Sequence, residues 1–208
     1  MSLSTDAPER AILVFSKAPV AGQVNTRLVP YISAEQAAQL HMELTHDRLK
    51  MSTSADACTV QLWCSPDTSH RFFDECNRRY GVQLQAQYGN DLGERMSNAL
   101  KAILGRFKKV IIIGTDAPEL GRDTIYAVFD QLEQKDVVLV PAEDGGYVLL
   151  GVSRYHDEML AGVPWGTENV LAHTLQNLER LKLDYGLAGK SWDVDRPEDL
   201  ERYRKLKI

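Results

Sequence analysis

The chain has 208 residues, 44% hydrophobic and 25% charged, with a formal net charge of −5 from 24 Lys and Arg against 29 Asp and Glu. This length and composition fit one globular α/β domain over residues 1–208, which is long enough to bury a substantial core. The acidic balance argues against a general affinity for nucleic acid, which needs a basic surface, and no apolar stretch reaches the roughly 18 residues of a membrane span.

The cysteines and the amino-terminal residues bear on the cellular compartment. Cys58, Cys64 and Cys76 are odd in number and lack the paired spacing of zinc or redox motifs. Residues 1–10, MSLSTDAPER, contain no apolar signal region. We therefore expect a cytoplasmic protein with reduced thiols, and the oligomeric state stays open.

The first predicted strand, at 11–16, leads into an irregular loop, KAPVAGQVNTRLVP, that is rich in proline and glycine. Lys17 and Arg27 bracket this loop, with Gly22 and small alanines between them. Backbone N–H groups of such a turn can approach a polyphosphate closely, and the two cations would neutralise its charge. The alternative is a solvated basic loop. The loop matches neither G-x-x-x-x-G-K-[ST] nor G-x-G-x-x-G.

The next segment alternates between helix and strand patterns. Ser33 and Gln36 have the spacing of a capping box, and an apolar stripe follows them, which predicts a helix at 33–51. His41 and His46 lie on this helix without a partner at metal-ligand spacing, so we interpret both as surface or packing residues. The following patterns predict a strand at 58–64, a helix at 66–80 and a strand at 82–87.

A tight loop marked by Gly89, Asn90 and Gly93 precedes a helix predicted at 94–107. Two interpretations of its charges stay open. Asp91 and Arg95 could form a local ion pair. Alternatively, the loop borders a ligand, with Arg95 on a phosphate and Asp91 on a base or sugar.

The central stretch of the chain is VIIIGTDAPEL, residues 110–120. Its first four residues predict a strand buried on both faces, as in the middle of a parallel sheet. Open α/β sheets bind ligands beyond the carboxyl ends of their strands, where the carboxylate of Asp116 could hold a divalent cation against phosphate oxygens. Alternatively, Asp116 caps the turn into a helix predicted at 124–132.

The segment EDGGYVLLG lies between strands predicted at 136–141 and 148–150, the second of which is a candidate antiparallel strand. Gly145 and Gly146 imply a sharp turn or a backbone that lies against a ligand. One interpretation is a plain hairpin turn. The other places Asp144 on substrate hydroxyls, next to Tyr147.

The last third of the chain supplies two further candidates. Trp165 either lines a pocket or fills the core, and Thr167 is predicted to cap a helix that runs to 181, before an edge strand at 183–187. Asp195 has the form of an N-cap for a final helix that begins at Pro197. Asp193 has no such structural role.

Strand and helix patterns alternate throughout and no interdomain linker is visible. This order predicts a three-layer α/β/α sandwich with a mainly parallel sheet.

Five segments carry a resemblance to a known group of proteins: KAPVAGQVNTRL, YGNDLGERM, GTDAPEL, EDGGYVLLG and DVDRPEDL. Their order and spacing resemble the GT-A-like, nucleotide-diphospho-sugar transferase superfamily. Within it they are most similar to the branch of radical-SAM/selenodomain-associated, glycosyltransferase-like transferases. The resemblance extends from about residue 12 to residue 200. Relatives with known chemistry include guanylyltransferases acting on phospholactate or molybdopterin, and true glycosyltransferases share the fold.

The resemblance implies a metal-dependent transferase that moves a nucleotidyl or glycosyl group to a small-molecule acceptor. The donor would be a nucleoside triphosphate or a nucleotide sugar, and the cofactor Mg²⁺ or Mn²⁺. The residues that it implies for the nucleotide are Lys17, Gly22, Asn25, Thr26, Arg27, Asp91, Gly93 and Arg95. Those implied for the acceptor are Asp144, Gly145, Gly146, Tyr147 and Trp165. Asp116, with Asp193 or Asp195, would hold the metal, and Lys17, Arg27, Asp116 and Asp144 would act in catalysis.

The chain departs from the family pattern at two positions. The family loop usually reads G-x-x-K-T-R-L, and here Asn25 replaces the lysine. Arg196 replaces a residue that is commonly Thr. The loss of a cation aimed at phosphate would weaken transition-state stabilisation. A catalytically weakened nucleotide-binding module with the same fold is therefore the alternative function.

Overall fold

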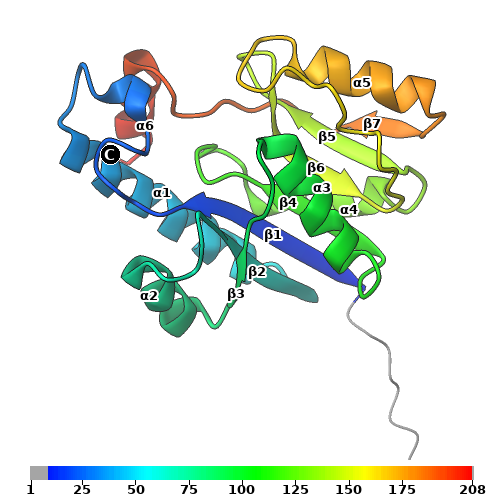
Figure 1. Ribbon diagram of the computed structural model, residues 1–208, viewed down its shortest axis with the longest axis horizontal. Helices are drawn as coiled ribbons and strands as arrows, with labels where there is room; N and C mark the ends of the chain where they lie inside the picture. Colours follow the sequence, from blue (N-terminus) through cyan, green and yellow to red (C-terminus); the bar gives the residue numbers. More distant parts are fainter. Residues whose placement is uncertain (1–8, 208) are drawn as a thin grey trace, which may run out of the picture.

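The computed structural model describes residues 9–207 and contains a seven-stranded sheet between two layers of helices (Figure 1). The strands are β1 (Arg10–Lys17), β2 (Cys58–Ser65), β3 (Gln83–Ala86), β4 (Lys109–Ile113), β5 (Val137–Pro141), β6 (Tyr147–Val152) and β7 (Tyr185–Leu187). The helices are α1 (Ala34–Thr53), α2 (Arg71–Tyr80), α3 (Leu92–Ile103), α4 (Arg122–Gln131), α5 (Val170–Arg180) and α6 (Pro197–Leu206), with a short 3₁₀ helix, η1 (Thr26–Leu28).

The strand order is β3-β2-β1-β4-β6-β5-β7, and every pairing is parallel except those of β6 with β4 and with β5. The expected three-layer α/β/α sandwich with a mainly parallel sheet is confirmed, including the antiparallel late strand. Each strand predicted from the sequence is present, because the apolar runs that signalled them are buried in the sheet.

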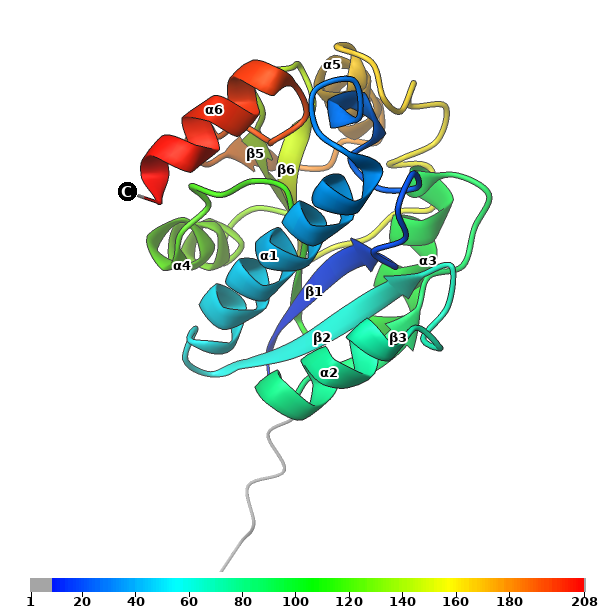
Figure 2. The same cartoon turned by 90° about the vertical axis from the view of Figure 1, so that its left-hand side faces the viewer.

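The two faces of the sheet bury alternate residues of the same strands. In β1, Ile12 and Val14 pack toward α1, α2 and α4, whereas Leu13 and Phe15 pack toward α3 and α5. Helix α6 lies outside these layers, beside α1 (Figure 2). A small separate core joins α6 to α1 and η1, formed by Leu28, Leu40, Leu44, Trp192, Val194, Leu200 and Tyr203.

Several helix boundaries differ from those predicted. The capping box of Ser33 and Gln36 at the start of α1 is confirmed. Helix α2 begins at Arg71 rather than near residue 66, with His70 at its N-cap. The predicted cap by Thr167 is wrong: α5 begins at Val170, and the Thr167 hydroxyl donates to the Pro164 carbonyl within the preceding loop.

The predicted N-cap at Asp195 is also wrong. The N-cap of α6 is Arg196, whose backbone N–H donates to the side chain of Asp199 at 2.7 Å. Pro197 takes the first helical position as expected. Because Arg196 and not Asp195 is the N-cap residue, the Asp195 carboxylate is available for a partner elsewhere in the fold.

The loops that carry the candidate residues meet at one edge of the sheet. Strands β1, β4 and β5 run in the same direction, so the loops that follow them leave from the same edge. Strand β2 pairs with one edge of β1, and β4 pairs with the opposite edge of β1. This is a point where the strand order reverses, the usual location of a ligand crevice in an open α/β sheet.

The structure bears on the expectations about membrane spans and about the cysteine thiols. Among residues 9–207, no helix has the length and apolar character needed to cross a bilayer. All three cysteines are free thiols, with Cys64 and Cys76 buried. Most of the segment 1–10, on which the expectation of no signal region rests, lies outside the described residues, since these begin at Glu9.

Candidate functional site

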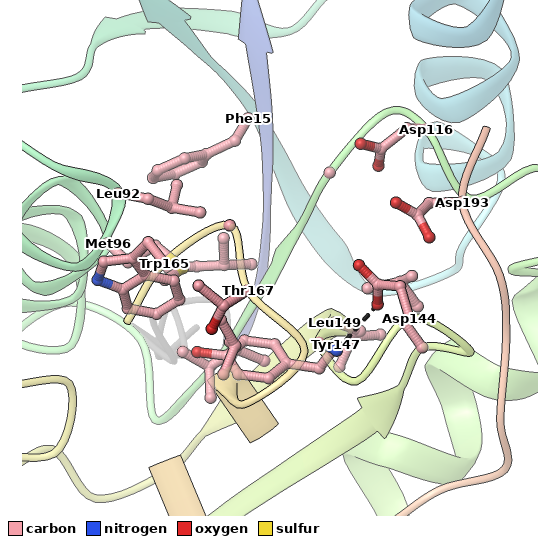
Figure 3. A pocket seen from close by; sticks show the side chains of 18 residues that line it. Phe15, Leu92, Met96, Asp116, Asp144, Tyr147, Leu149, Trp165, Thr167 and Asp193 are labelled. Atoms are coloured by element: carbon pink, nitrogen blue, oxygen red, sulfur yellow. Dashed lines mark hydrogen bonds between the residues drawn. The ribbon is translucent and has the colours of Figure 1, made fainter. Parts of the chain in front are cut away.

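Three adjoining cavities lie along this edge of the sheet. The Lys17 cavity, about 480 Å³, is lined by residues of β1, α1, the loop before α3 and the loop after β4. The Trp165 cavity, about 210 Å³, is lined by residues of β1, α3, β6 and the loops after β4 and before α5 (Figure 3). The Arg27 cavity, about 760 Å³, lies beyond it. Asp116 lines the first two cavities, and Asp144 and Asp193 line the second and third.

Asp116 is half-buried at the end of β4, and its carboxylate faces the cleft (Figure 3). Burial raises the pKa of its carboxyl group above the ordinary value. Helix α4 has Gly121 at its N-cap and no side-chain cap, so the helix itself is not capped by Asp116. A Cβ at Gly114 would lie 2.7 Å from Asp116 Oδ1, so glycine leaves the space that this carboxylate occupies.

Arg48 of α1 supports the Asp116 loop from beneath. Its guanidinium, only 3% exposed, donates to the carbonyl of Leu120 at 2.6 Å and to that of Ala117. Burial lowers the pKa of Arg48 to about 10, and the nearby charge of Asp116 opposes this shift. A charged donor is thus used to satisfy loop carbonyls that would otherwise be buried without a partner.

Asp193 is brought to Asp116 by a backbone hydrogen bond. The N–H of Val194 donates to the Asp116 carbonyl at 2.8 Å, which joins the carboxy-terminal segment to the end of β4. Burial, together with the negative charges of Asp116, Asp144 and Asp195, raises the pKa of Asp193 to about 7. The side chains of Asp116, Asp193 and Asp144 line one side of the cleft in Figure 3.

Asp144 lies in the turn between β5 and β6, so the hairpin interpretation is correct and the side chain nevertheless lines the cleft. Its Oδ1 accepts a hydrogen bond from the Gly146 N–H at 2.9 Å, which orients the carboxylate. Gly145 has a φ of +91°, and a Cβ there would collide with the backbone carbonyl of Glu168. The paired glycines therefore serve the turn and its packing on the loop before α5.

The carboxylates suit a hydrated divalent cation better than a closed metal cage. Within residues 9–207, no group of three or more His, Cys, Asp or Glu side chains is arranged to hold a metal ion. Mg²⁺ typically uses one or two carboxylates and completes its shell with water and substrate phosphates. Asp116 and Asp193 fit that requirement, because the burial of both carboxylates and the charge of Asp116 next to Asp193 favour an added positive charge.

The Lys17 cavity provides a cation and several hydrogen-bonding groups. Lys17 is exposed, and across the described chain no carboxylate lies within ion-pairing distance of its Nζ. Asn25 adopts a left-handed conformation with φ +48°, and its amide donates to the Ala37 carbonyl at 3.3 Å. Arg95 lines the same cavity and donates to the Gly89 carbonyl and to Ser65 Oγ, both at 3.1 Å.

Asp91 lines the Lys17 cavity as the N-cap of α3, where its side chain accepts from the Glu94 N–H at 2.8 Å. The suggested ion pair between Asp91 and Arg95 is wrong, because Arg95 turns to the loop carbonyl and Ser65 instead. Gly93 lies beneath Trp165, where a Cβ would be 2.6 Å from the indole Nε1.

Arg27 lies apart from Lys17. Its guanidinium pairs with Asp195 and lines the Arg27 cavity, while Lys17 lines the cavity on the other side of Asp116. The pair with Asp195 raises the pKa of Arg27. Gly22, with φ +78°, and Thr26 of η1 are exposed and line none of these three cavities.

Tyr147 and Trp165 line the Trp165 cavity, where their rings meet edge to face with centroids 6.3 Å apart. Trp165 is half-buried rather than enclosed in the core. This location agrees with the pocket interpretation of Trp165.

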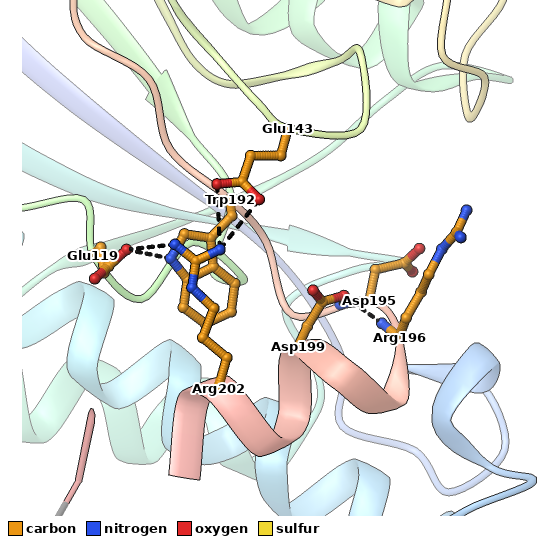
Figure 4. Close-up of polar contacts among 7 residues, drawn as sticks. All are labelled: Glu119, Glu143, Trp192, Asp195, Arg196, Asp199 and Arg202. Carbon is orange, nitrogen blue, oxygen red and sulfur yellow. Dashed lines mark hydrogen bonds and ion pairs between the residues drawn. The ribbon is translucent and has the colours of Figure 1, made fainter. Parts of the chain in front are cut away.

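Arg202 of α6 contacts three residues that lie close in sequence to Asp116, Asp144 and Asp193 (Figure 4). Arg202 pairs with Glu119 at 3.3 Å and with Glu143 at 3.1 Å, and its Cζ lies 4.0 Å from the ring centroid of Trp192. The Trp192 indole N–H also donates to Glu119. Glu119 lies three positions after Asp116, Glu143 directly precedes Asp144, and Trp192 directly precedes Asp193. We call Arg202 and these three contacts the Arg202 cluster.

The sequence patterns did not identify several residues that shape the cleft. Phe15 lines the Trp165 cavity, but in the sequence it is indistinguishable from the other apolar core residues of β1. His41, interpreted as a surface or packing residue, is buried with its Nε2 3.0 Å from the Lys17 carbonyl, and it lines the Lys17 cavity. Arg48 and Arg202 lie in helices far along the chain from the loops that they hold, so no local spacing could reveal them.

The fold and the arrangement of the cleft define the GT-A-like, nucleotide-diphospho-sugar transferase fold. The crystal structure of a proposed nucleotide-diphospho-sugar transferase from Desulfovibrio desulfuricans G20 superposes with a TM-score of 0.81 at 28% identity, covering 90% of this chain and 83% of that one. The chain belongs to the family described as "Uncharacterized protein conserved in bacteria (DUF2064)", which matches residues 48–167.

One curated relative and one further solved structure are also similar to this chain. The 2-phospho-L-lactate guanylyltransferase of Methanobrevibacter smithii is 27% identical over 127 residues, which cover 60% of this chain and 54% of the relative. The chain thus spans about half the length of the curated relative that it matches. A mannosyltransferase from Pyrobaculum calidifontis, solved with GDP-Man and Mn²⁺, shares the fold at 14% identity and a TM-score of 0.56, covering 97% of this chain and 61% of that one.

We predict that Gly114→Ala displaces the Asp116 carboxylate without unfolding the protein. The new Cβ would meet only the end of a side chain, which can rotate, so the cost in unfolding free energy should stay within about 1 kcal/mol. A crystal structure of the variant should show Asp116 in another rotamer. An unmoved Asp116 would mean that Gly114 has no part in placing it.

We predict that Arg202→Met loosens three loops together. Its ion pairs are 43–51% exposed, so their loss should lower stability by only about 1 kcal/mol. Amide hydrogen exchange should nevertheless rise around residues 117–121, 142–146 and 190–194. Arg204→Met, an exposed position on the same helix, is the control and should change none of them. Faster exchange in a single loop would contradict a shared anchor.

Proposed function

We propose that this protein is a metal-dependent transferase that moves a nucleotidyl group from a nucleoside triphosphate to a hydroxyl of a small acceptor. The observation that carries the proposal is the placement of Asp116 and Asp193 side by side beyond β4, with the ammonium of Lys17, unpaired among residues 9–207, in the adjoining cavity. Carboxylates for a cation and a cation for phosphate thus lie in one cleft.

The Lys17 cavity is assigned to the nucleotide. Lys17 would neutralise phosphate charge, and Arg95 and Asp91 would form the wall toward the base and sugar. Asn25, in the position of the family lysine, would offer a neutral amide. Arg27 would contribute less than the sequence implied, because Asp195 already balances its charge.

Asp116 and Asp193 would hold Mg²⁺ or Mn²⁺. When bound, such a cation stabilises negative charge on the phosphate oxygens and on the leaving group. Asp195 is assigned to Arg27 rather than to the metal, because the two side chains are paired.

In the proposed reaction, the oxygen of an acceptor hydroxyl forms a bond to the α-phosphorus of the donor. The bond from that phosphorus to the oxygen bridging to the β-phosphate breaks, and pyrophosphate leaves with the electron pair. Asp144, which lines the Trp165 cavity rather than the Lys17 cavity, would orient the hydroxyl and accept its proton.

Two alternatives each have a specific support. Glycosyl transfer from a nucleotide sugar is supported by the Desulfovibrio protein, a proposed nucleotide-diphospho-sugar transferase. A nucleotide-binding module with weakened turnover is supported by Asn25, whose amide is engaged with Ala37 where the family lysine would reach toward phosphate. Nucleotidyl transfer is preferred because the Methanobrevibacter relative is a guanylyltransferase.

Three further expectations remain proposals. The order and spacing of the five motifs support the radical-SAM/selenodomain-associated branch. A single domain over residues 1–208 and a cytoplasmic location follow from composition and from the reduced cysteines.

We predict that Asp116→Asn abolishes metal-dependent nucleotide binding. For the unchanged protein, a nucleoside triphosphate at about 100 times its dissociation constant should add about 2.7 kcal/mol of stability in Mg²⁺ or Mn²⁺, or roughly 5–10 °C in Tm. The variant should lose this increment, and pyrophosphate release should fall by about 10²-fold or more. Asp56→Asn, an exposed site at the opposite edge of the sheet, should retain both. Metal-independent binding without product release would favour the module.

We predict that Lys17→Met weakens nucleotide binding more than Arg27→Met does. A charge-assisted contact contributes about 1.5–3 kcal/mol, so the dissociation constant should rise about 10–100-fold for Lys17→Met. Isothermal titration with each nucleoside triphosphate in Mg²⁺ measures this, with Lys50→Met at the far end of α1 as the control. Equal effects of the Lys17 and Arg27 changes would contradict the assignment of the Lys17 cavity.

A further inference from the structure

The charged groups of the cleft are unevenly distributed between its two ends. The Lys17 cavity carries two cations, Lys17 and Arg95, against Asp91 and Asp116. The Trp165 cavity is lined by three carboxylates and by no Lys, Arg or His of the described chain. A phosphate group therefore finds cationic side chains in the Lys17 cavity but none among the described residues that line the Trp165 cavity.

The Arg27 cavity does not restore the balance. Arg27 and Arg196 are its only lining cations in the structurally described residues, and Arg27 is already paired with Asp195. Six carboxylates line the same cavity: Glu143, Asp144, Glu168, Asp193, Asp195 and Asp199. One divalent cation would offset two of these charges. An anionic group placed here would still face a net negative surrounding.

Apart from these carboxylates, the Trp165 cavity is lined mainly by apolar side chains, several of which are aromatic rings packed on one another. Trp165 and Tyr147 meet edge to face, and Phe15 stacks on Trp63 with ring centroids 6.0 Å apart. Gly93 leaves room for the Trp165 indole, so a larger residue there would displace the ring. Aromatic faces of this kind pack against hydrocarbon or sugar-ring surfaces of a ligand.

We propose that the Trp165 cavity selects an uncharged acceptor, one without phosphate or carboxylate, whose hydrocarbon or sugar-ring face packs on Trp165 and Tyr147. This inference rests on the proposed function for the identity of the ligand as the acceptor. The triphosphate lies in the Lys17 cavity, and the acceptor hydroxyl meets Asp144 where the two cavities adjoin at Asp116. The chain would thus differ from the Methanobrevibacter relative, whose name specifies a phosphorylated substrate.

The test compares matched neutral and phosphorylated probes. Phenyl β-D-glucopyranoside and benzyl alcohol are the neutral probes, and phenyl phosphate and glucose 6-phosphate are the anionic ones. Each is titrated into the full chain by calorimetry in Mg²⁺, with and without the nucleoside triphosphate that stabilises the protein most. We expect at least one neutral probe to bind 10-fold or more tightly than both phosphates.

Three variants locate that binding. Trp165→Ala should weaken the neutral probe 10-fold or more, whereas Trp165→Phe should retain most of its affinity because it keeps an aromatic face. Asp144→Asn should narrow the difference between neutral and phosphorylated probes several-fold, since it removes one negative charge. Tyr88→Ala, an exposed aromatic that lines none of the three cavities, is the control and should change neither affinity.

The proposal is overturned if a phosphorylated probe binds as tightly as the neutral ones and loses affinity in Trp165→Ala. It is equally overturned if Trp165→Ala leaves the neutral probe unaffected, or if no neutral probe binds at millimolar concentration beside a bound nucleotide. Failure of the proposed function has a separate signature, because nucleotide titration then shows no metal-dependent binding whatever the probes do.

Discussion

The hydrogen bond from the Val194 N–H to the Asp116 carbonyl is the contact on which the cleft depends. It joins the end of β4, a central strand, to a segment nearly eighty residues further along the chain. Asp116 and Asp193 consequently lie together in a partly buried place, where neither charge is well solvated. Burial raises the pKa of both carboxyl groups, and the charge of Asp116 adds to the shift at Asp193, which favours a cation between these carboxylates and a phosphate.

The structure maintains this unfavourable proximity through contacts outside the cleft. Arg48 fixes the loop after β4 from the buried side, and the Arg202 cluster fixes it from the surface. The Arg202 contacts are partly exposed, so they add little to global stability, yet they connect three loops of the cleft to one helix. The contacts that connect the cleft loops are thus different from the buried core contacts that contribute most of the folding stability.

Charge also divides the cleft along its length. The cationic end holds Lys17, while the aromatic end is surrounded by carboxylates. The pair between Arg27 and Asp195 strengthens the division, because it neutralises the cation nearest to the aromatic end. A phosphorylated donor and an uncharged acceptor would be sorted by this difference before any specific contact forms.

The sequence by itself determined the layers and the strands of the fold, because runs such as 110–113 and the capping box at Ser33 are local signals of burial and of helix starts. It also located Asp116, since a carboxylate directly after a buried strand must lie at the sheet edge. Only the tertiary structure decided which side chains contact one another around the cleft. Asp195 was predicted as a helix cap from adjacent residues, but it pairs with Arg27, 168 positions away. Arg48, Arg202 and the division of the cleft into a cationic and an aromatic end likewise depend on contacts between distant segments, which no local spacing encodes.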